Sequence, residues 1–349
     1  MRAVCVTPGV KDSLRLVDDA PEPPDAEGAV LVEAVAVGIC GTDREIIAGE
    51  YGQAPPGSDT LVLGHESVGR VLADPTGTLR PGDLVAGIVR RPDPQPCLNC
   101  AVGEWDLCRN GRYTEHGILG LPGFARERWR MPPEFLIRLN PELGECGVLL
   151  EPASVVAKAW EHIDRIGQRG RWEPRVALVT GAGTIGLLAA MFAKQRGLDV
   201  HVLARGTGGL KPQLVAELGG TYHAGSVLEL DFAPDVVVEC TGVDTVVLDV
   251  MRKAGPNAVV CLLGVGVGQP RDGVDTTVFV RDLVLRNTAV FGAVNANRRH
   301  WAHAADALGQ ADRTWLSKMI TRRCPLESYA EAYGGTGEDI KVVLEFAAG

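Results

Sequence analysis

The sequence predicts an α/β protein of two domains, a β-rich, barrel-like domain followed by a doubly wound parallel sheet. Residues 1–150 are rich in Gly and Pro, and turn signals such as Pro81-Gly82-Asp83 separate short apolar runs. That pattern is typical of many short strands. After Trp172, short apolar runs alternate with helix-compatible stretches, which indicates a parallel sheet. A length of 349 residues is enough for two domains with full hydrophobic cores.

The individual elements follow from the apolar runs. In the first domain we expect strands at 29–37 and 61–63. In the second we expect a helix from 187 to 196 that ends at Gly197, because glycine is common just past a helix C-terminus. The last part of the chain predicts a helix around 301–308 and a terminal strand at 340–346. The remaining expected elements are strands at 175–180, 200–204, 235–239, 258–263 and 288–293, and a helix around 245–254.

Composition and charge exclude several classes of function. The net charge is −9 without long single-sign runs, so we expect neither a nucleic-acid partner nor binding to an anionic membrane surface. The chain contains no run of about 20 apolar residues, and Met1–Thr7 begins no signal peptide. A cytoplasmic protein with a small-molecule substrate is the expectation. Nine cysteines, an odd number, favour metal binding and buried thiols over a disulfide framework.

A glycine-rich segment between a predicted strand and a predicted helix indicates a Rossmann-type cofactor site. The segment reads Gly181-Ala182-Gly183-Thr184-Ile185-Gly186. Its glycines allow a tight turn, close approach of the backbone to a pyrophosphate, and close packing of helix on strand. We therefore expect Gly181, Gly183, Thr184, Ile185 and Gly186 to bind a nicotinamide dinucleotide. The alternative is a glycine turn without a ligand.

The end of the next predicted strand favours NADP over NAD. NAD enzymes place Asp or Glu there to bind the ribose 2′-hydroxyl, whereas this chain has Ala204 followed by Arg205. A guanidinium binds a 2′-phosphate well. If Arg205 is only a solvated loop charge, the protein accepts either cofactor.

Four residues have the chemistry of a catalytic zinc site. They are Cys40, His65, Glu66 and Glu151, in the motifs Gly-Ile-Cys-Gly-Thr-Asp, Gly-His-Glu and Leu-Leu-Glu-Pro. Three protein ligands and one open position are the usual catalytic arrangement for Zn²⁺. Such a metal stabilises an alkoxide while hydride moves to or from the nicotinamide. Any one of these residues alone is more often structural, and only their joint occurrence ahead of a nucleotide-binding unit carries the hypothesis.

Two neighbours of Cys40 complete the expected catalytic group. Asp43 is placed to orient His65 from behind. Thr42, two residues after the first ligand, is placed to pass the alcohol proton towards solvent. Glu66 is expected in the catalytic group as well as among the metal ligands.

These motifs together resemble those of zinc-dependent medium-chain dehydrogenases, over essentially the whole chain. Within that family the sequence is most similar to the glucose dehydrogenase branch. The residues that carry this similarity are Cys-Gly-Thr-Asp-Arg44-Glu45-Ile, Arg90-Arg91, Thr114-Glu115-x-Gly117-Ile118, Glu217-Leu218-Gly219 and Val294-Asn295-Ala-Asn297-Arg-Arg-His300-Trp.

The resemblance implies a GroES-like catalytic domain of residues 1–153 and 296–349, and a Rossmann domain of residues 154–295. It implies zinc bound by Cys40 and His65 with Glu66 or Glu151, and Thr42 in a proton relay. It also implies a homodimer or homotetramer, for which the strand at 288–293 is a plausible pairing edge. It further places Glu115 against sugar hydroxyls, Asn295 near nicotinamide and substrate, and Thr241 at the cofactor.

Two departures from the glucose dehydrogenase pattern bear on the substrate. An Asn is expected before the Arg-Arg pair and a Gln four residues before Glu151, but the chain has Val89 and Gly147. A buried sugar hydroxyl without its amide partner costs about 1–3 kcal/mol. Glucose, a less hydroxylated or modified sugar, a cyclitol and another secondary alcohol all stay open. Gly147 is also expected to leave room for a larger substituent, and water or a neighbouring side chain is the alternative replacement for the amides.

A cysteine cluster suggests a second, structural zinc. Cys97, Cys100 and Cys108 match three of the four cysteines that many family members carry, and Pro94 stands at the first position. Structural zinc is normally four-coordinate. Either a carboxylate (Asp93, Glu104 or Asp106) completes the site or the site holds no metal.

The sequence therefore predicts a zinc-dependent NAD(P) oxidoreductase that oxidises a secondary alcohol of a sugar, cyclitol or related polyol. One alternative is an NADPH-dependent reductase of a ketone in a biosynthetic pathway. A non-catalytic nucleotide-binding protein on the same fold is the other, against which the intact metal motif argues.

Overall fold

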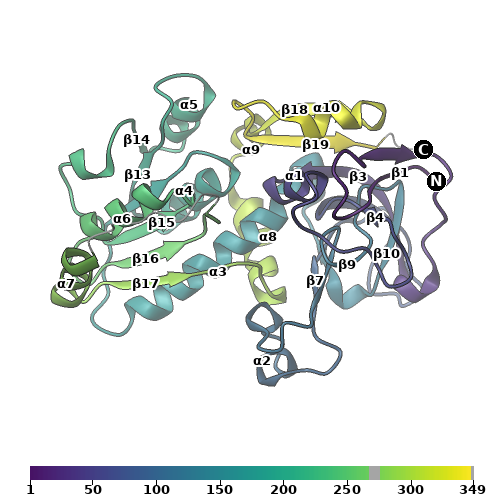
Figure 1. The fold of residues 1–349 in the computed structure, drawn as a ribbon, viewed down its shortest axis with the longest axis horizontal. Helices are drawn as coiled ribbons and strands as arrows, with labels where there is room; N and C mark the ends of the chain where they lie inside the picture. Colours follow the sequence, from purple (N-terminus) through teal and green to yellow (C-terminus); the bar gives the residue numbers. More distant parts are fainter. Residues whose placement is uncertain (267–275, 347–349) are drawn as a thin grey trace. The chain divides into compact units, whose positions relative to one another are not determined.

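The computed structural model describes residues 1–266 and 276–346, and the chain forms two compact units. The first unit comprises Met1–Ser154 and Asn295–Gly349, and the second comprises Val155–Val294. Figure 1 labels many of the helices and strands of both units.

A six-stranded parallel sheet forms the centre of the second unit. Its strand order is β14-β13-β12-β15-β16-β17, the arrangement of a doubly wound nucleotide-binding sheet, so the predicted α/β class is confirmed. Such sheets bind ligands beyond the carboxyl ends of the strands where the order reverses, here at β12 and β15. The strands are β12 Val176–Thr180, β13 Asp199–Leu203, β14 Thr221–His223, β15 Val236–Glu239, β16 Val259–Leu262 and β17 Ala289–Gly292.

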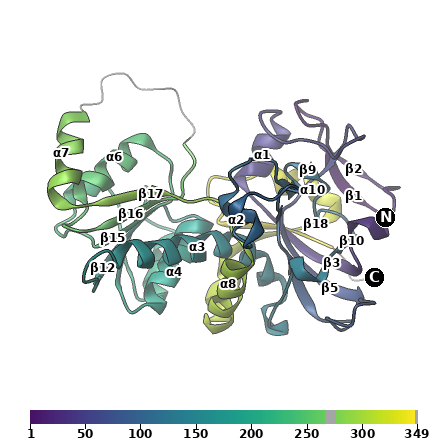
Figure 2. The ribbon, with the colours of Figure 1, turned by 90° about the horizontal axis from the view of Figure 1, so that it is seen from below.

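Helices cover both faces of this sheet. Figure 2 shows α3 and α4 on one face and α6 and α7 on the other. Buried aliphatic residues such as Leu178, Val237 and Val260 fill the space under α6, which is why strands of this unit are continuous apolar runs. The helices are α3 Leu150–Gly167, α4 Thr184–Gln195, α5 Leu210–Glu217, α6 Asp244–Lys253 and α7 Thr276–Arg286.

The first unit is built around the long strand β3, Val30–Ile39. This strand pairs antiparallel with β5, β10 and β19, so the C-terminal strand of the chain returns to the first unit. The seven-stranded sheet has the order β11-β6-β5-β3-β19-β18, with β10 on β3. Its other strands are β5 Glu66–Ala73, β6 Leu84–Gly87, β10 Arg128–Met131, β11 Leu136–Arg138, β18 Ile320–Pro325 and β19 Lys341–Glu345.

Two smaller sheets complete the first unit. One has the order β2-β1-β4, and the other has the order β7-β8-β9. Their strands are β1 Ala3–Val6, β2 Arg15–Val17, β4 Leu61–Val62, β7 Arg90–Arg91, β8 Thr114–His116 and β9 Gly120–Leu121. The longest α-helix of this unit is α8, Arg298–Gln310. The shorter ones are α1 Gly41–Ile47, α2 Leu98–Ala101, α9 Arg313–Met319 and α10 Tyr329–Gly334.

Among the described residues, no helix is both long and apolar enough to cross a lipid bilayer.

Candidate active site

Cys40 lies where β3 ends and α1 begins. It is the N-cap residue of α1, and its thiol accepts a hydrogen bond from the backbone N–H of Asp43. The carboxylate of Asp43 accepts one in return from the backbone N–H of Cys40, at 2.8 Å. This reciprocal cap explains why the chain turns sharply after an apolar strand, and it fixes the thiol at a helix N-terminus, where negative charge is favoured.

His65 lies beside Cys40 because the chain makes a glycine turn just before it. Gly64 has a φ of +87°, and a Cβ there would lie 2.6 Å from Cγ1 of Val37. His65 is buried, and its Nδ1 lies 3.4 Å from Oδ1 of Asp43. Burial by itself lowers the pKa of His65, but the charge of Asp43 and its hydrogen bonding, with a contribution from Cys40, outweigh it and raise the pKa well above its usual value.

The structure brings three of the four predicted zinc ligands together. The ligand atoms of Cys40, His65 and Glu66 all lie within 4.8 Å of one another. A sulfur, an imidazole nitrogen and a carboxylate oxygen at that spacing suit a tetrahedral Zn²⁺ with an open position. Nδ1 of His65 and Oδ1 of Asp43 are buried without a hydrogen bond. These two atoms face each other at 3.4 Å, so Asp43 is placed to orient the ring.

Glu66 is also held by a buried lysine that the sequence analysis does not single out. Nζ of Lys341 lies 2.5 Å and 2.7 Å from the two carboxylate oxygens of Glu66 and donates to the carbonyl of Ile39 at 3.1 Å. An ammonium has three protons to donate, so this set accounts for all of them. A Cβ on Gly38 would overlap Oε2 of Glu66. Glycine on β3 therefore makes space for this carboxylate.

Glu151, the fourth predicted ligand, is not part of the cluster of ligand atoms that lie within 4.8 Å of one another. It is the second residue of α3. The residue as a whole is partly exposed, but its carboxyl group is buried away from water. That desolvation raises the pKa of Glu151 to about 7, with the charge of His65 acting against the shift and that of Glu66 adding to it. Glu151 is thus a second carboxylate beside Glu66. Thr42, the expected proton relay, is half-buried in the first turn of α1.

Glu115 lies on β8 in the same unit, and its charge also contributes to the raised pKa of Glu151. Its Oε1 accepts hydrogen bonds from Arg90 Nε at 3.0 Å and from Asn295 Nδ2 at 2.8 Å. Asn295 adopts a left-handed backbone conformation with φ of +59°. The amide of Asn295, expected near the nicotinamide, thus lies against Glu115 within the first unit.

The expected free space beside Gly147 is absent, so that expectation is wrong. A Cβ on Gly147 would lie 2.6 Å from Cγ2 of Val68 and 2.8 Å from Cδ1 of Leu139. Glycine is therefore needed here for packing. Val89 is only 2% exposed, and its carbonyl accepts a hydrogen bond from His116 N at 3.0 Å.

The three cysteines of the expected structural zinc site lie close together, but no carboxylate of the described residues joins them as a fourth ligand. The sulfurs of Cys97, Cys100 and Cys108 lie within 4.8 Å of one another, and in the described chain no Asp or Glu joins them at that distance. Asp93 instead accepts hydrogen bonds from Gln95 and Asn110, and Asp106 accepts one from Asn297. Glu104 lies 3.8 Å from Arg299.

The glycine loop of the second unit has the geometry of a dinucleotide site. Gly181 has a φ of +91°, and Gly183 is the N-cap of α4. A Cβ on Gly186 would overlap the carbonyl oxygen of Gly181. The loop therefore closes tightly between β12 and the N-terminus of α4, the kind of position at which a pyrophosphate binds.

The next two strand ends flank this loop. Oε1 of the buried Glu239 accepts hydrogen bonds from Thr180 Oγ1 at 3.1 Å and from Thr241 N at 2.7 Å. Glu239 thereby ties the start of the glycine loop to the loop that carries Thr241. Arg205 follows β13 and is exposed, as a residue that binds a phosphate must be.

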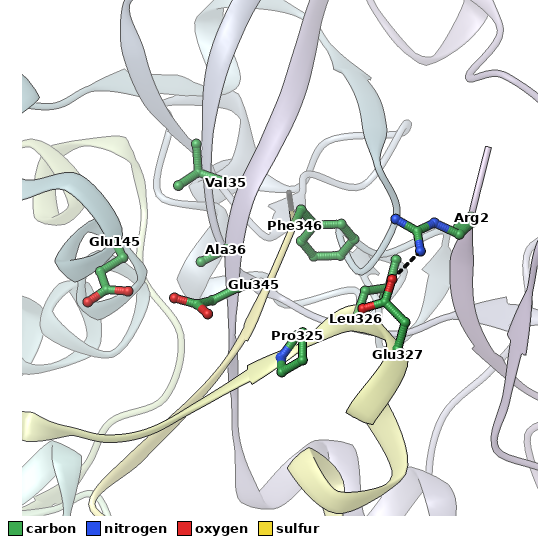
Figure 3. Close-up of a pocket in the computed structure, with 9 residues that line it drawn as sticks. All are labelled: Arg2, Val35, Ala36, Glu145, Pro325, Leu326, Glu327, Glu345 and Phe346. Carbon is green, nitrogen blue, oxygen red and sulfur yellow. Dashed lines mark hydrogen bonds and ion pairs between the residues drawn. The ribbon is translucent and has the colours of Figure 1, made fainter. Parts of the chain in front are cut away.

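A cavity of about 350 Å³ elsewhere in the first unit contains none of the predicted site residues. Figure 3 shows its apolar lining, including Val35 and Phe346, with the carboxylates of Glu145 and Glu345 beside it. Burial and the neighbouring Glu145 raise the pKa of Glu345. The candidate active site is therefore identified by its side-chain chemistry, not by this cavity.

Comparison with known proteins covers almost the whole chain. The family model described as the alcohol dehydrogenase GroES-like domain matches residues 26–141, and that of the glucose dehydrogenase C-terminus matches residues 144–346. Glucose 1-dehydrogenase 1 of Caldivirga maquilingensis is 44% identical over 99% of both chains. Glucose 1-dehydrogenase of Methanocella arvoryzae is 40% identical over 100% of both chains.

The chain belongs to the zinc-dependent medium-chain dehydrogenase family, in its glucose dehydrogenase branch. A solved structure of Haloferax mediterranei glucose dehydrogenase, in complex with NADP, Zn and gluconolactone, superposes with a TM-score of 0.91 at 32% identity and covers 100% of both chains. The predicted family, its GroES-like and Rossmann folds, and the enzyme class, a zinc-dependent NAD(P)-linked sugar or polyol dehydrogenase, are confirmed.

Lys341 is the residue of this site that sequence reasoning missed. One signal was present in the sequence: Lys341 interrupts an otherwise apolar run from Ile340 to Leu344. A lysine in a strand expected to be buried requires a carboxylate partner. The pattern did not say which carboxylate, because Glu66 is 275 residues away.

Proposed function

We propose that this dehydrogenase oxidises D-glucose or a closely related aldose at C1, with NADP⁺ as the hydride acceptor. The hydride leaves C1, the hydroxyl proton leaves to solvent, and the sugar becomes its lactone. One observation carries the proposal: the Cys40, His65 and Glu66 cluster lies in the same unit as Glu115, a buried carboxylate whose charge acts on Glu151. The two curated relatives are named for this activity.

We assign the cluster to zinc because its donor set and spacing fit that ion. Cys40 and His65 are the constant ligands, and the carboxylate comes from Glu66 or Glu151. Bound there, zinc would serve as a Lewis acid for the reacting sugar oxygen. Asp43 holds the ring of His65 in place, and Thr42 takes the proton from the reacting hydroxyl towards solvent.

We place the sugar against Glu115, whose carboxylate accepts hydrogen bonds from hydroxyl groups. Asn295 supports that carboxylate with its amide. The two positions at which the branch carries further amides, Val89 and Gly147, are packed into the protein. The proposal is therefore that Glu115 and its supports bind the sugar without these amides.

We assign the cofactor to the second unit, at the carboxyl ends of β12, β13 and β15. Gly181, Gly183, Thr184, Ile185 and Gly186 would hold the pyrophosphate, and Thr241 lies on the adjoining loop. NADP is favoured because Ala204 replaces the acid that repels a 2′-phosphate and Arg205 is exposed beside it.

Three further parts of the proposal concern the oligomeric state, the cellular location and the cluster of Cys97, Cys100 and Cys108. The edge strand β17 adjoins exposed apolar side chains of α7, Val280, Val284 and Leu285, which supports a homo-oligomer formed through this edge. All nine cysteines are free thiols, which supports a cytoplasmic location. Cys97, Cys100 and Cys108 would hold a structural zinc only with a fourth ligand from solvent.

NADPH and NADH absorbance after mixing with a sugar panel tests the function. The panel contains glucose, galactose, xylose, inositols and simple secondary alcohols, each with NADP⁺ and NAD⁺, and with or without a zinc chelator. We expect turnover of glucose with NADP⁺ that the chelator abolishes. Turnover of none of the sugars, with cofactor still binding, would refute glucose as the substrate class and favour the ketone reductase, which a ketone panel with NADPH detects.

A further inference from the structure

We propose that Arg90 is a positioning residue that determines sugar specificity, by directing one oxygen of Glu115 towards the substrate. The inference rests on the proposed function, since it takes Glu115 as the group that binds sugar hydroxyls. Arg90 and Glu115 are cross-strand partners in the β7–β8 pair. They are 5% and 6% exposed, so their charges compensate each other inside the protein.

All three guanidinium nitrogens of Arg90 contact the protein. Nε and Nη2 both lie against Oε1 of Glu115, at 3.0 Å and 2.9 Å. Nη1 donates to the carbonyl of Asp106 at 3.5 Å, and the guanidinium stacks on the ring of Tyr113, 3.6 Å from its centroid. A planar fork held on three sides has one orientation. Arg90 is thus not available to contact a substrate and acts through Glu115.

The result is a carboxylate with two unlike oxygens. Oε1 accepts from Arg90 and also from Asn295, at 2.8 Å. No described residue donates to Oε2, and this atom is not among the fully buried polar atoms without a partner. A carboxylate oxygen has lone pairs for two hydroxyl donors. Oε2 is therefore the oxygen left for the sugar, and Arg90 fixes which way it points.

This arrangement offers a physical substitute for the missing amides at Val89 and Gly147. An oriented carboxylate oxygen accepts hydrogen bonds from two adjacent hydroxyls, and its charge makes each of them stronger than a hydrogen bond to a neutral amide. Preorganisation matters because a hydroxyl meets a fixed acceptor without an ordering cost at binding. Specificity for a vicinal diol would then depend on Arg90 although Arg90 does not contact it.

Arg90→Met tests this inference, with Arg91→Met as the matched control. Arg91 is the neighbour on β7, stacks on Phe135 and donates to the carbonyl of Ile88. It therefore reports the general cost of losing an arginine from this strand. Arg90→Lys keeps the charge without the fork, and serves as the second variant should Arg90→Met fail to fold.

The main readout is kcat and KM for glucose and for each monodeoxyglucose. For Arg90→Met and Arg90→Lys we expect KM for glucose to rise roughly 10- to 100-fold, as for loss of a charge-assisted hydrogen bond, with KM for NADP⁺ unchanged. The rise should be smaller for a deoxy sugar that lacks one of the hydroxyls bound by Glu115, because that sugar has already lost part of the interaction. Arg91→Met should leave the ratios between sugars unchanged. Equal losses for glucose and every deoxy sugar would overturn the inference.

A double variant and a crystal structure separate this inference from the function itself. In a Glu115→Gln background, Arg90→Met should add little further loss, because Arg90 acts through Glu115. If the wild type oxidises no sugar, the proposed function fails, and the structure of Arg90→Met still decides the positioning role. In the structure of Arg90→Met we expect the carboxylate of Glu115 to rotate away from its wild-type orientation. In Arg91→Met we expect it to keep that orientation. An unmoved Glu115 in Arg90→Met would contradict the inference.

Discussion

Lys341 Nζ lies 2.5 Å and 2.7 Å from the two oxygens of Glu66, so a buried lysine and the proposed zinc site share one carboxylate. Lys341 is 4% exposed and Glu66 is 1% exposed. Neither charge is solvated by water, so Lys341 depends on Glu66 for compensation, whereas Glu66 is compensated by Lys341 or by a metal cation. The ion pair therefore couples folding of the first unit to the metal site.

Lys341→Met should lower the free energy of unfolding of the metal-free protein by about 3–5 kcal/mol, the usual cost of leaving one buried charge unpaired. Bound zinc would compensate Glu66, so zinc should stabilise the variant more than the wild type. Urea unfolding with and without a chelator measures both quantities. The double variant Lys341→Met/Glu66→Gln removes the unpaired charge and should recover part of the loss. A double variant less stable than Lys341→Met would contradict the coupling.

Gly186→Ala and Gly183→Ala should separate folding from cofactor binding. A Cβ on Gly186 would overlap the carbonyl of Gly181, whereas a Cβ on Gly183 meets nothing within 4 Å. We expect Gly186→Ala to destabilise the second unit by about 1–3 kcal/mol through overpacking. Gly183→Ala should unfold like the wild type but bind NADP⁺ more weakly, because its methyl group stands where the pyrophosphate approaches. Thermal unfolding and NADP⁺ titration distinguish the two, and equal stability of both variants would refute the proposed loop packing.

Arg205→Ala should raise Kd for NADP⁺ roughly 10- to 100-fold, the range for a charge-assisted hydrogen bond to phosphate. Kd for NAD⁺ should stay unchanged, because NAD⁺ lacks the 2′-phosphate. Arg175→Ala is the matched control, since Arg175 is an exposed arginine just before β12, at the amino ends of the parallel strands, whereas Arg205 lies at their carboxyl ends. Isothermal titration of the three proteins provides the comparison. Unchanged NADP⁺ binding in Arg205→Ala would remove the basis for NADP preference.

His116 should make the first unit lose stability as the pH falls. It is 4% exposed and stacks on Phe124. Burial, reinforced by the charge of Arg91, holds its pKa well below the ordinary 6.5. Below about pH 6.5 the unfolded chain therefore binds a proton that the folded chain does not. The free energy of unfolding then falls with decreasing pH, by up to about 1.4 kcal/mol per pH unit for one proton.

Comparison with His116→Gln isolates that contribution from other titrating groups. Between pH 7.5 and pH 5.5, about one unit on either side of the ordinary value, the wild type should lose more unfolding free energy than His116→Gln. A pH dependence identical in both proteins would show that His116 does not contribute.

Local patterns predict most of the second unit well. The strand expected at 175–180 is β12, Val176–Thr180, and the one expected at 235–239 is β15, Val236–Glu239. The helix expected from 187 begins at Thr184, because the glycine loop itself supplies its N-cap. The short strand β14, Thr221–His223, was not expected. Three residues without an apolar run carry no periodic signal.

The sequence also indicates which residues meet at the metal site, but not what surrounds them. Cys40 and His65 are found through their local motifs. Lys341 and Arg90 act through partners that are distant in sequence, and the packing around Gly147 depends on Val68 and Leu139. Such contacts follow from sheet pairing and core packing, which no local pattern records. The wrong expectation of space at Gly147 has this cause.

The most direct test of the account follows deuterium from C1-deuterated D-glucose to the cofactor. We predict that the zinc-replete protein transfers the label to NADP⁺, giving deuterated NADPH and the lactone, as detected by mass spectrometry. The chelator-treated protein and Cys40→Ser should transfer none. Label that stays on the sugar in the zinc-replete protein, or that moves equally well after chelation, would contradict zinc-dependent hydride transfer at this site.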